Sequence, residues 1–404
     1  MIERVRKSLS SASASLIAIL AGLLAGFVIL LASNPSSALA GLATVLKGGW
    51  NGGIKGVGQM LYYATPIIMT GLSVGFAFKT GMFNIGASGQ LMVGGLISIY
   101  VGATWTFLPG HLHWIVALLM GMLGGMCWGM IVGIFKALLN VNEVITAIML
   151  NYIGMYGVNY VIKNSHLYNQ LRNHTVDVAA SAVIPKAGLD SIFYMMKGVY
   201  KDASSVNAGI LIAILCAVLI YILLSKTTFG YELKACGFNR DASRYAGISE
   251  KKAIITSMAI AGALSGIAGA LMYLAPSSGM HIDVEEILAP QGFNGIAVAL
   301  LGLSNPIGII FSGLFVAHIS VGGSYLQSLK YMKEVVDIII GLIIYFSAFS
   351  LLVRDVMKRI AGKRRAAQVV QVHREGITPA EVIPAGAAPD AAPRDDTGQK
   401  EAQP

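Results

Sequence analysis

Apolar segments long enough to cross a lipid bilayer recur along nearly the whole of this chain of 404 residues. A helix needs about 20 apolar residues to span the roughly 30 Å of hydrocarbon in a membrane. Ten segments are candidates: 16–31, 56–78, 87–107, 114–139, 143–162, 206–224, 253–274, 289–303, 307–322 and 335–353. They predict an all-α polytopic membrane protein with about ten transmembrane helices, some of them short or broken.

Composition agrees with this class, since 55% of the residues are hydrophobic and only 12% are charged. Soluble domains carry about 25% charged residues. In a soluble protein the net charge of +9 would suggest nucleic acid, but here the Lys and Arg residues lie in short loops and the tail. We therefore expect membrane lipid and no nucleic acid as a partner. Cys127, Cys216 and Cys236 show no disulfide or metal-site spacing, and we expect three free thiols.

The first apolar run has an alternative interpretation as a cleaved secretory signal. It follows Arg4, Arg6 and Lys7, and it precedes the small-residue sequence Ala38-Leu39-Ala40. Signal cores hold about 7 to 15 apolar residues, and the run 16–31 is slightly longer. We favour a retained transmembrane helix.

Positive charges in the short loops predict the orientation. Lys79, Lys136, the 226–252 segment and the basic segment 354–365 fall on one side together with the N-terminus, and an even number of spans places both termini in the cytoplasm. The predicted organisation is a cytoplasmic N-terminus (1–14), a transmembrane domain (15–353) with an external loop (163–205) and a cytoplasmic loop (226–252), and a basic, then disordered tail (354–404).

The helical pattern is interrupted at two places. Glycines and Asn84 break the apolar stretch between 78 and 90, and Asn305-Pro306 separates two short candidates within 289–322, which predicts short or re-entrant helices there. At membrane depth, non-helical backbone is tolerated only where it is buried in protein or lines a cavity. Asn84, Ser88 and Gln90 are therefore candidate substrate-pathway residues, with a cytoplasmic turn and a helix cap as the equal alternative.

Two further sets of amides and aromatics are pathway candidates. Gln291, Phe293 and Asn294 begin an apolar helix and suit a neutral polar solute that carries a ring, since aromatics stack and amides form hydrogen bonds; packing with a cap is the alternative. Asn151 lies about two turns beyond Glu143, inside the predicted membrane helix. A hydrogen bond between helices explains this amide as well as solute binding does.

Small residues predict close helix packing. They recur at spacings of four in two of the predicted helices: Gly121, Gly125, Gly129 and Gly133, and Gly262 and Gly266. This pattern indicates a tightly packed bundle and carries no information about the substrate.

The charged segment 229–252 is a candidate docking element for a soluble partner. Its helix-compatible core is broken at Gly237 and ends near Gly247. The residues that would contact the partner are Glu232, Asn239, Arg240, Asp241, Arg244 and Tyr245. An ordinary basic loop that obeys the positive-inside rule is the alternative.

The sequence lacks the residues that several other functions would require. The chain has no Gly-x-x-x-x-Gly-Lys-Ser/Thr sequence, so it does not bind ATP by that device. Ionisable residues within the spans are few and lie near helix ends, as Glu143, His318 and Asp337 do, which disfavours an ion-coupled secondary transporter. No nucleophile-base pair or metal-ligand motif indicates an intramembrane enzyme.

Four segments, in this order, resemble the permease subunits of bacterial ABC importers for nucleosides: 79–90, 142–152, 237–248 and 292–308. This family is related to the branched-chain amino-acid and ribose-type sugar permeases, and the resemblance covers about residues 56–353. One position departs from the family pattern Asn-Ile-Gly-Ala-Glu-Gly-Gln, because Ser88 stands in the place of the Glu. The loss of that carboxylate affects the expected substrate more than the expected type of transporter.

The resemblance implies a multi-pass protein of the bacterial inner membrane with several partners. These are a second permease subunit, usually a different chain, two cytoplasmic ATPase subunits that hold ATP and Mg, and an external solute-binding lipoprotein. It also implies that 229–248 contains the helix that couples to the ATPase, and that this chain holds no cofactor and performs no covalent chemistry. We expect a nucleoside as the solute. One alternative is an ABC permease for a ribose-type sugar, and the other is an ion-coupled secondary transporter.

Overall fold

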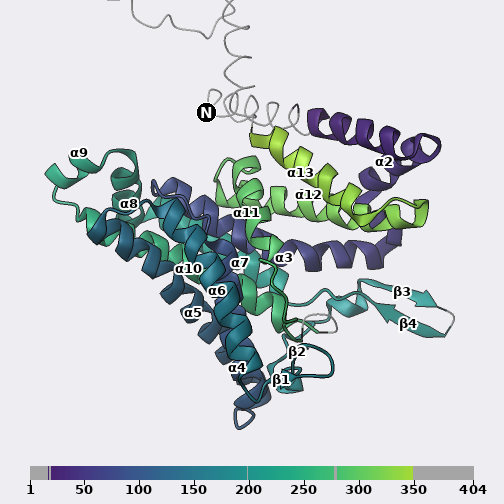
Figure 1. Cartoon of the computed structure of the whole chain (residues 1–404), viewed down its shortest axis with the longest axis horizontal. Helices are drawn as coiled ribbons and strands as arrows, with labels where there is room; N and C mark the ends of the chain where they lie inside the picture. The colour runs from purple at the N-terminus through teal and green to yellow at the C-terminus, as the bar shows by residue number, and fades with distance from the viewer. Residues whose placement is uncertain (1–16, 18–19, 198, 277–279, 349–404) are drawn as a thin grey trace, which may run out of the picture. The chain divides into compact units, whose positions relative to one another are not determined.

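The computed structural model describes residues 17, 20–197, 199–276 and 280–348, and nearly all of its regular structure is helical (Figure 1). The helices are Leu20–Ser33, α2 (Ala38–Lys47), α3 (Gly53–Lys79), α4 (Ala87–Thr104), α5 (Gly110–Leu139), α6 (Glu143–Lys163), α7 (Gly209–Lys226), α8 (Thr228–Phe238), α9 (Arg240–Tyr245), α10 (Glu250–Tyr273), α11 (Pro290–Leu301), α12 (Pro306–Ser324) and α13 (Lys333–Ala348). Short 3-10 helices cover Pro35–Ser37, Gly48–Gly52, Ala180–Ala182, Leu189–Ser191 and Tyr325–Leu329. The predicted segments 1–14 and 354–404 lie outside the described residues.

Strands occur only in the predicted external loop, as far as the described residues show. β1 (Tyr168–Asn169) pairs with β2 (His174–Thr175), and β3 (Tyr194–Lys197) pairs with β4 (Tyr200–Ala203), both antiparallel. They are a small correction to the all-α prediction. A loop outside the hydrocarbon can pair its backbone groups across short strands, which the spans must do within helices.

Seven segments of the described chain are long and apolar enough to cross a membrane. They are Pro35–Lys79, Ala87–Thr104, Gly110–Leu139, Glu143–Lys163, Gly209–Lys226, Glu250–Tyr273 and Pro306–Leu329. Seven of the about ten predicted spans therefore have the length and composition that crossing a membrane requires. The other three predicted spans are shorter: the helix Leu20–Ser33, α11 and the 16 described residues of α13.

The predicted short pair at 289–322 contains one short helix. α11 has 12 residues and is about 18 Å long, so it covers little more than half of the hydrocarbon. α12 reaches the length of a span because the Asn305 side chain caps its first turn and the helix continues to Ser324.

The glycine faces predicted from the sequence pack against each other, α5 on α10. A Cβ atom on Gly125 would lie 2.4 Å from the Gly262 carbonyl oxygen, and one on Gly266 would lie 2.3 Å from the Gly121 carbonyl oxygen. Only glycine allows the two backbones to approach this closely. The predicted close packing is confirmed, and it joins the centre of the bundle.

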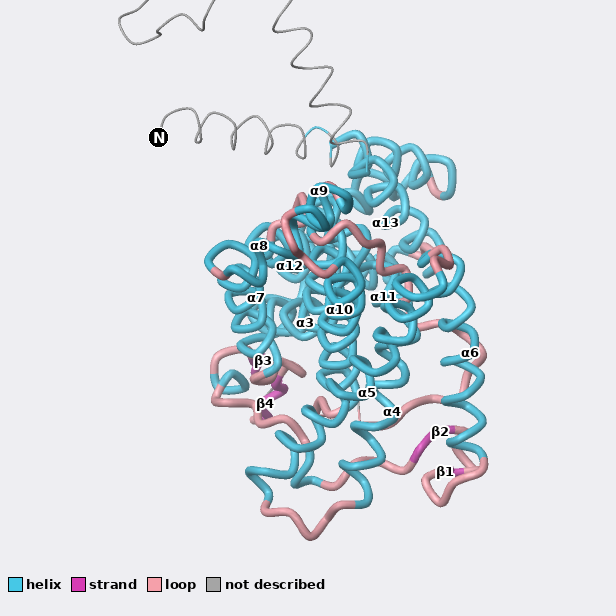
Figure 2. The backbone as a smooth tube through the Cα atoms, turned by 90° about the vertical axis from the view of Figure 1, so that its left-hand side faces the viewer, coloured by secondary structure: helices cyan, strands magenta, loops and turns pink. Residues whose placement is uncertain are grey.

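Loops predicted to share a side do lie together. A Cβ on Gly81 would lie 2.4 Å from the Gly237 Cα, so the loop after α3 and the 226–252 segment meet at one end of the bundle. The predicted external loop (163–205) and its strands lie at the other end (Figure 2). Both chain termini fall outside the described residues, and their cytoplasmic placement remains a prediction.

The helix Leu20–Ser33 packs in a cluster of its own with α2, α12 and α13. The Tyr331 hydroxyl, just before α13, donates to the Asn34 carbonyl at 2.9 Å, and Leu30 is buried in the same cluster. This packing favours a retained helix over a cleaved signal. The three cysteines are free thiols, as predicted.

Candidate functional site

The break between α3 and α4 lies inside the bundle and is held by a pair of amides. The Asn84 and Gln90 side chains exchange two hydrogen bonds, of 2.8 and 2.9 Å, and both residues are fully buried. Asn84 also donates to the Ser73 hydroxyl at 2.9 Å. Ser73 lies six residues before the end of α3, about 9 Å along the helix. The chain therefore turns back into the bundle before α4 begins.

Asn151 of α6 supplies hydrogen-bond partners for two backbone groups at this break. Its Oδ1 accepts from the Gly89 backbone N–H at 2.8 Å, and its Nδ2 donates to the Ile85 carbonyl at 3.0 Å. The first turn of a helix has unpaired N–H groups, and the residues before it have unpaired carbonyls. A single buried amide supplies both missing partners.

The N-termini of α4 and α11 meet beside the middle of α3. The Ser88 hydroxyl donates to the Ala289 carbonyl, and a Cβ on Gly292 would lie 2.5 Å from the Ser88 Cα. The Thr70 hydroxyl in turn donates to the Gln291 carbonyl at 2.8 Å. Since α4 runs toward the predicted external end and α11 runs away from it, the two helices meet head to head within the bundle.

The structure thus brings four of the six predicted pathway residues together: Asn84, Ser88, Gln90 and Asn151. Their side chains bind one another or nearby backbone, as the cap and helix-contact interpretations require. The other two begin α11, where Phe293 is 40% exposed and Asn294 is half-buried. Contact with the solute remains a prediction for all six.

A cavity of about 230 Å³ lies above this meeting point, between α3, α4, α10 and the segment that leads into α11. Its lining consists of aromatic, acidic, amide and apolar residues: Tyr62, Met92, Met272, Tyr273, His281, Ile282, Asp283, Glu285, Ile287, Leu288, Ala289, Pro290 and Gln291. Sequence reasoning identified Gln291 but missed the two tyrosines and the two acids. The alternation of apolar and acidic residues over 282–285 was the available signal.

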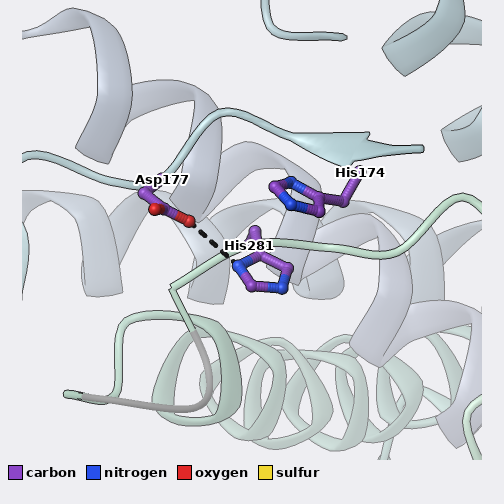
Figure 3. A group of neighbouring side chains, drawn as sticks. All are labelled: His174, Asp177 and His281. Carbon is purple, nitrogen blue, oxygen red and sulfur yellow. Dashed lines mark hydrogen bonds and ion pairs between the residues drawn. The ribbon is translucent and has the colours of Figure 1, made fainter. Parts of the chain in front are cut away.

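Two histidines and an aspartate lie together (Figure 3), and one of them, His281, lines this cavity. His281 Nδ1 lies 2.9 Å from an Asp177 carboxylate oxygen, and the His174 ring stacks on the His281 ring with centroids 4.1 Å apart. Their donor atoms lie within 4.8 Å of one another, close enough for a metal ion. The rings are nearly parallel, at 19°, so their in-plane lone pairs do not converge on one point. The arrangement supports an anchor between two loops better than a metal centre.

The predicted docking segment forms two short helices at the opposite end of the bundle, α8 and α9 (Figure 1). They are separated at Asn239, whose side chain caps α9 by accepting from the Ala242 N–H at 3.0 Å. Tyr245 is 95% exposed, and Arg240 lies 3.7 Å from Glu250 of α10. The other predicted contacts, Glu232, Asp241 and Arg244, are exposed. These side chains are free to contact a partner.

Comparison with known proteins gives a consistent result. The family model described as "Branched-chain amino acid transport system / permease component" matches residues 56–348. The guanosine ABC transporter permease protein NupP of Bacillus subtilis is 38% identical over 88% of this chain and 99% of its own. The nucleoside ABC transporter permease protein NupB of Lactococcus lactis is 35% identical over 85% of this chain and 92% of its own.

A glucose ABC transporter permease protein of Haloferax volcanii is more distant, at 29% identity over 72% of this chain and 75% of its own. No solved structure matches the chain.

Proposed function

This chain belongs to the branched-chain amino acid transport system permease family, and from that premise we propose that it carries nucleosides across the bacterial inner membrane. It is the permease of an ABC importer, and ATP hydrolysis occurs on a separate subunit. The observation that supports nucleosides is its similarity to the guanosine and nucleoside permeases over more than four-fifths of its length. A sugar is less supported, since the glucose permease is more distant.

The proposed pathway runs from the cavity to the point where α4 and α11 meet. Two helix N-termini and a network of amides make this region polar, while its surroundings are apolar. A transport site must release what it admits, so contacts from Asn84, Ser88, Gln90, Asn151, Phe293 and Asn294 would be weak and brief. Relative movement of α4 and α11 would open the pathway inward.

The proposed partners are two ATPase subunits, a second permease and an external solute-binding lipoprotein. The ATPase would contact α8 and α9, whose exposed residues include Asp241, Arg244 and Tyr245. Because α9 is joined to α10 through Arg240 and Glu250, movement of α9 would pass into the centre of the bundle.

Uptake of radiolabelled nucleosides and sugars tests the proposed function. Cells that express this chain with its partner subunits should take up nucleosides, and an inactive ATPase should abolish that uptake. Uptake by this chain alone, lost on addition of an ionophore, would instead indicate an ion-coupled secondary transporter.

The coupling role has its own test, reversal of charge at Arg240 and Arg244 to Glu. We expect nucleoside uptake to be abolished while the amount of protein in the membrane is unchanged, since both residues are at least partly exposed. Lys201→Glu, in the predicted external hairpin, is the matched control. Normal solute-stimulated ATP hydrolysis in the double variant would contradict the coupling assignment.

A further inference from the structure

The segment 281–287, which leads into α11, forms one wall of the cavity. His281, Asp283, Glu285 and Ile287 line the cavity, and so does the buried Ile282, whereas Val284 is buried away from it. Alternate residues of an extended chain share a face, and the rise of about 3.3 Å per residue places Asp283 and Glu285 about 7 Å apart. Two carboxylates therefore face one small space.

The backbone of this segment is held in place by the external loop. The Thr175 N–H donates to the Ile282 carbonyl and the Val284 N–H donates to the Asn173 carbonyl, each at 3.0 Å. The Asn159 side chain donates to the Glu285 carbonyl at 2.8 Å. These bonds fix the backbone that carries the two acids. Both side chains are exposed, and Asp283 Oδ1 lies 3.9 Å from His281 Nε2, so the carboxylate oxygens can still accept hydrogen bonds.

The rest of the lining suits an aromatic ring and a polar edge. Tyr62 of α3 and Tyr273 of α10 contribute rings, and Met92 and Met272 contribute thioether side chains. The Gln291 Oε1 is buried and has no hydrogen-bond partner. A buried acceptor without a partner is costly, so a solute that supplies an N–H or O–H would be favoured there.

We propose that this cavity is a recognition site for ribonucleosides, in which Asp283 and Glu285 accept hydrogen bonds from the ribose hydroxyls. The inference rests on the proposed transport of nucleosides and adds how the sugar is recognised. Carboxylates bind ribose hydroxyls in dinucleotide-binding proteins, and aromatic side chains stack on bases. Gln291 would accept from the base, and Tyr62 and Tyr273 would pack against it. The same carboxylates repel phosphate, so nucleotides are excluded.

The cavity is smaller than a complete nucleoside site. Small-molecule sites usually measure about 300 to 1,000 Å³, and this one measures about 230 Å³. It can therefore enclose only part of a nucleoside, and in this proposal that part is the ribose. The cavity ends at Ala289, Pro290 and Gln291, where α4 and α11 meet, so a bound ribonucleoside would lie directly above the proposed pathway.

The test compares ribonucleoside with 2′,3′-dideoxynucleoside uptake by the complete transporter carrying Asp283→Asn or Glu285→Gln. Each substitution keeps an acceptor oxygen but removes the negative charge that strengthens its hydrogen bond, so KM for the ribonucleoside should rise about tenfold, while KM for the dideoxynucleoside changes less than twofold. Glu286→Gln is the matched control, because Glu286 is exposed and does not line the cavity. Equal effects on both solutes would overturn the proposal.

A second measurement tests solute binding to the permease itself, separately from binding to the external solute-binding protein. In a variant without the native cysteines, Ile287→Cys should react with a membrane-impermeant maleimide, since Ile287 is exposed in the cavity. Guanosine should slow this labelling, and guanosine monophosphate should not. Labelling unchanged by guanosine, in a transporter that still imports it, would overturn the cavity assignment and leave the proposed function intact. A wild-type transporter that imports no nucleoside would contradict the proposed function itself.

Discussion

The two polar regions beside α11 use their hydrogen-bonding groups in opposite ways. At the break before α4, the polar side chains bind protein: Asn84 binds Gln90, and Asn151 binds the backbone. In the segment 281–287 the backbone is bound, and the Asp283 and Glu285 side chains face a cavity. Polar residues in the first region therefore stabilise the fold. In the second region His281 binds Asp177, whereas the exposed carboxylates of Asp283 and Glu285 can still accept from a solute. Substitutions in the first region should therefore change mainly stability, and those in the second should change mainly solute uptake.

The largest loss of stability should come from Asn151→Leu. It would leave a buried N–H and a buried carbonyl unpaired, at about 1 to 3 kcal/mol each, or about 4 kcal/mol together. Thermal denaturation of the purified complex in detergent measures the effect. Asn164→Leu is the control, because Asn164 caps the exposed end of α6. If stability is retained and only uptake is lost, Asn151 belongs to the solute pathway.

Gly292→Ala should have the next largest effect. The added methyl group would lie 2.5 Å from the Ser88 backbone, so the two helix N-termini would have to separate. Overpacking of this kind costs about 1 to 3 kcal/mol. Gly157→Ala is the control, since a Cβ at that position of α6 would have no atom within 4 Å. Equal melting temperatures for the two variants would show that the helix ends are not in tight contact.

A smaller effect is expected from Ser88→Ala, which removes the hydroxyl that binds the Ala289 carbonyl. The loss should be about 1 kcal/mol. Since this bond connects the two regions, uptake should fall several-fold while the amount of folded protein changes little. Thr104→Ala, at the exposed end of α4, is the control because its hydroxyl binds only its own helix. Uptake equal to that of the control would show that the bond does not couple the regions.

The smallest effect on stability is expected from Asn294→Leu. Asn294 is half-buried at the beginning of α11, so its replacement should change stability by less than about 0.5 kcal/mol. Transport should nevertheless weaken, with a higher KM for nucleosides. Kinetics that are unchanged for every solute tested would remove Asn294 from the pathway.

Much of the fold could be predicted because the bilayer acts on each segment separately. The length of the hydrocarbon selects spans of about 20 residues, and seven of the ten predicted segments meet that requirement. The predicted number of spans is too high at α11, because this apolar run was counted as a span although its helix has only 12 residues. Its shortness depends on the preceding segment, which enters the bundle in an extended form because it pairs with the external loop.

The candidate site could be predicted only in part. The amides at Asn84, Gln90 and Asn151 were identifiable because a polar residue in an apolar run needs a partner wherever it lies. The cavity was not, because Tyr62 and Glu285 are separated by more than 200 residues and no local pattern brings them together.

The sequence by itself determined that this is a membrane protein, where most of its spans lie and where the helices break, because hydrophobic length and unpaired backbone groups act within a segment. Its order of motifs also determined the family. Only the tertiary structure decided that Asn84 binds Gln90, that the glycines of α5 meet those of α10, and that Asp283 and Glu285 face a cavity. For each of these contacts, several residues in the chain have a suitable size or hydrogen-bonding group. Which of them meet depends on how all the helices pack together.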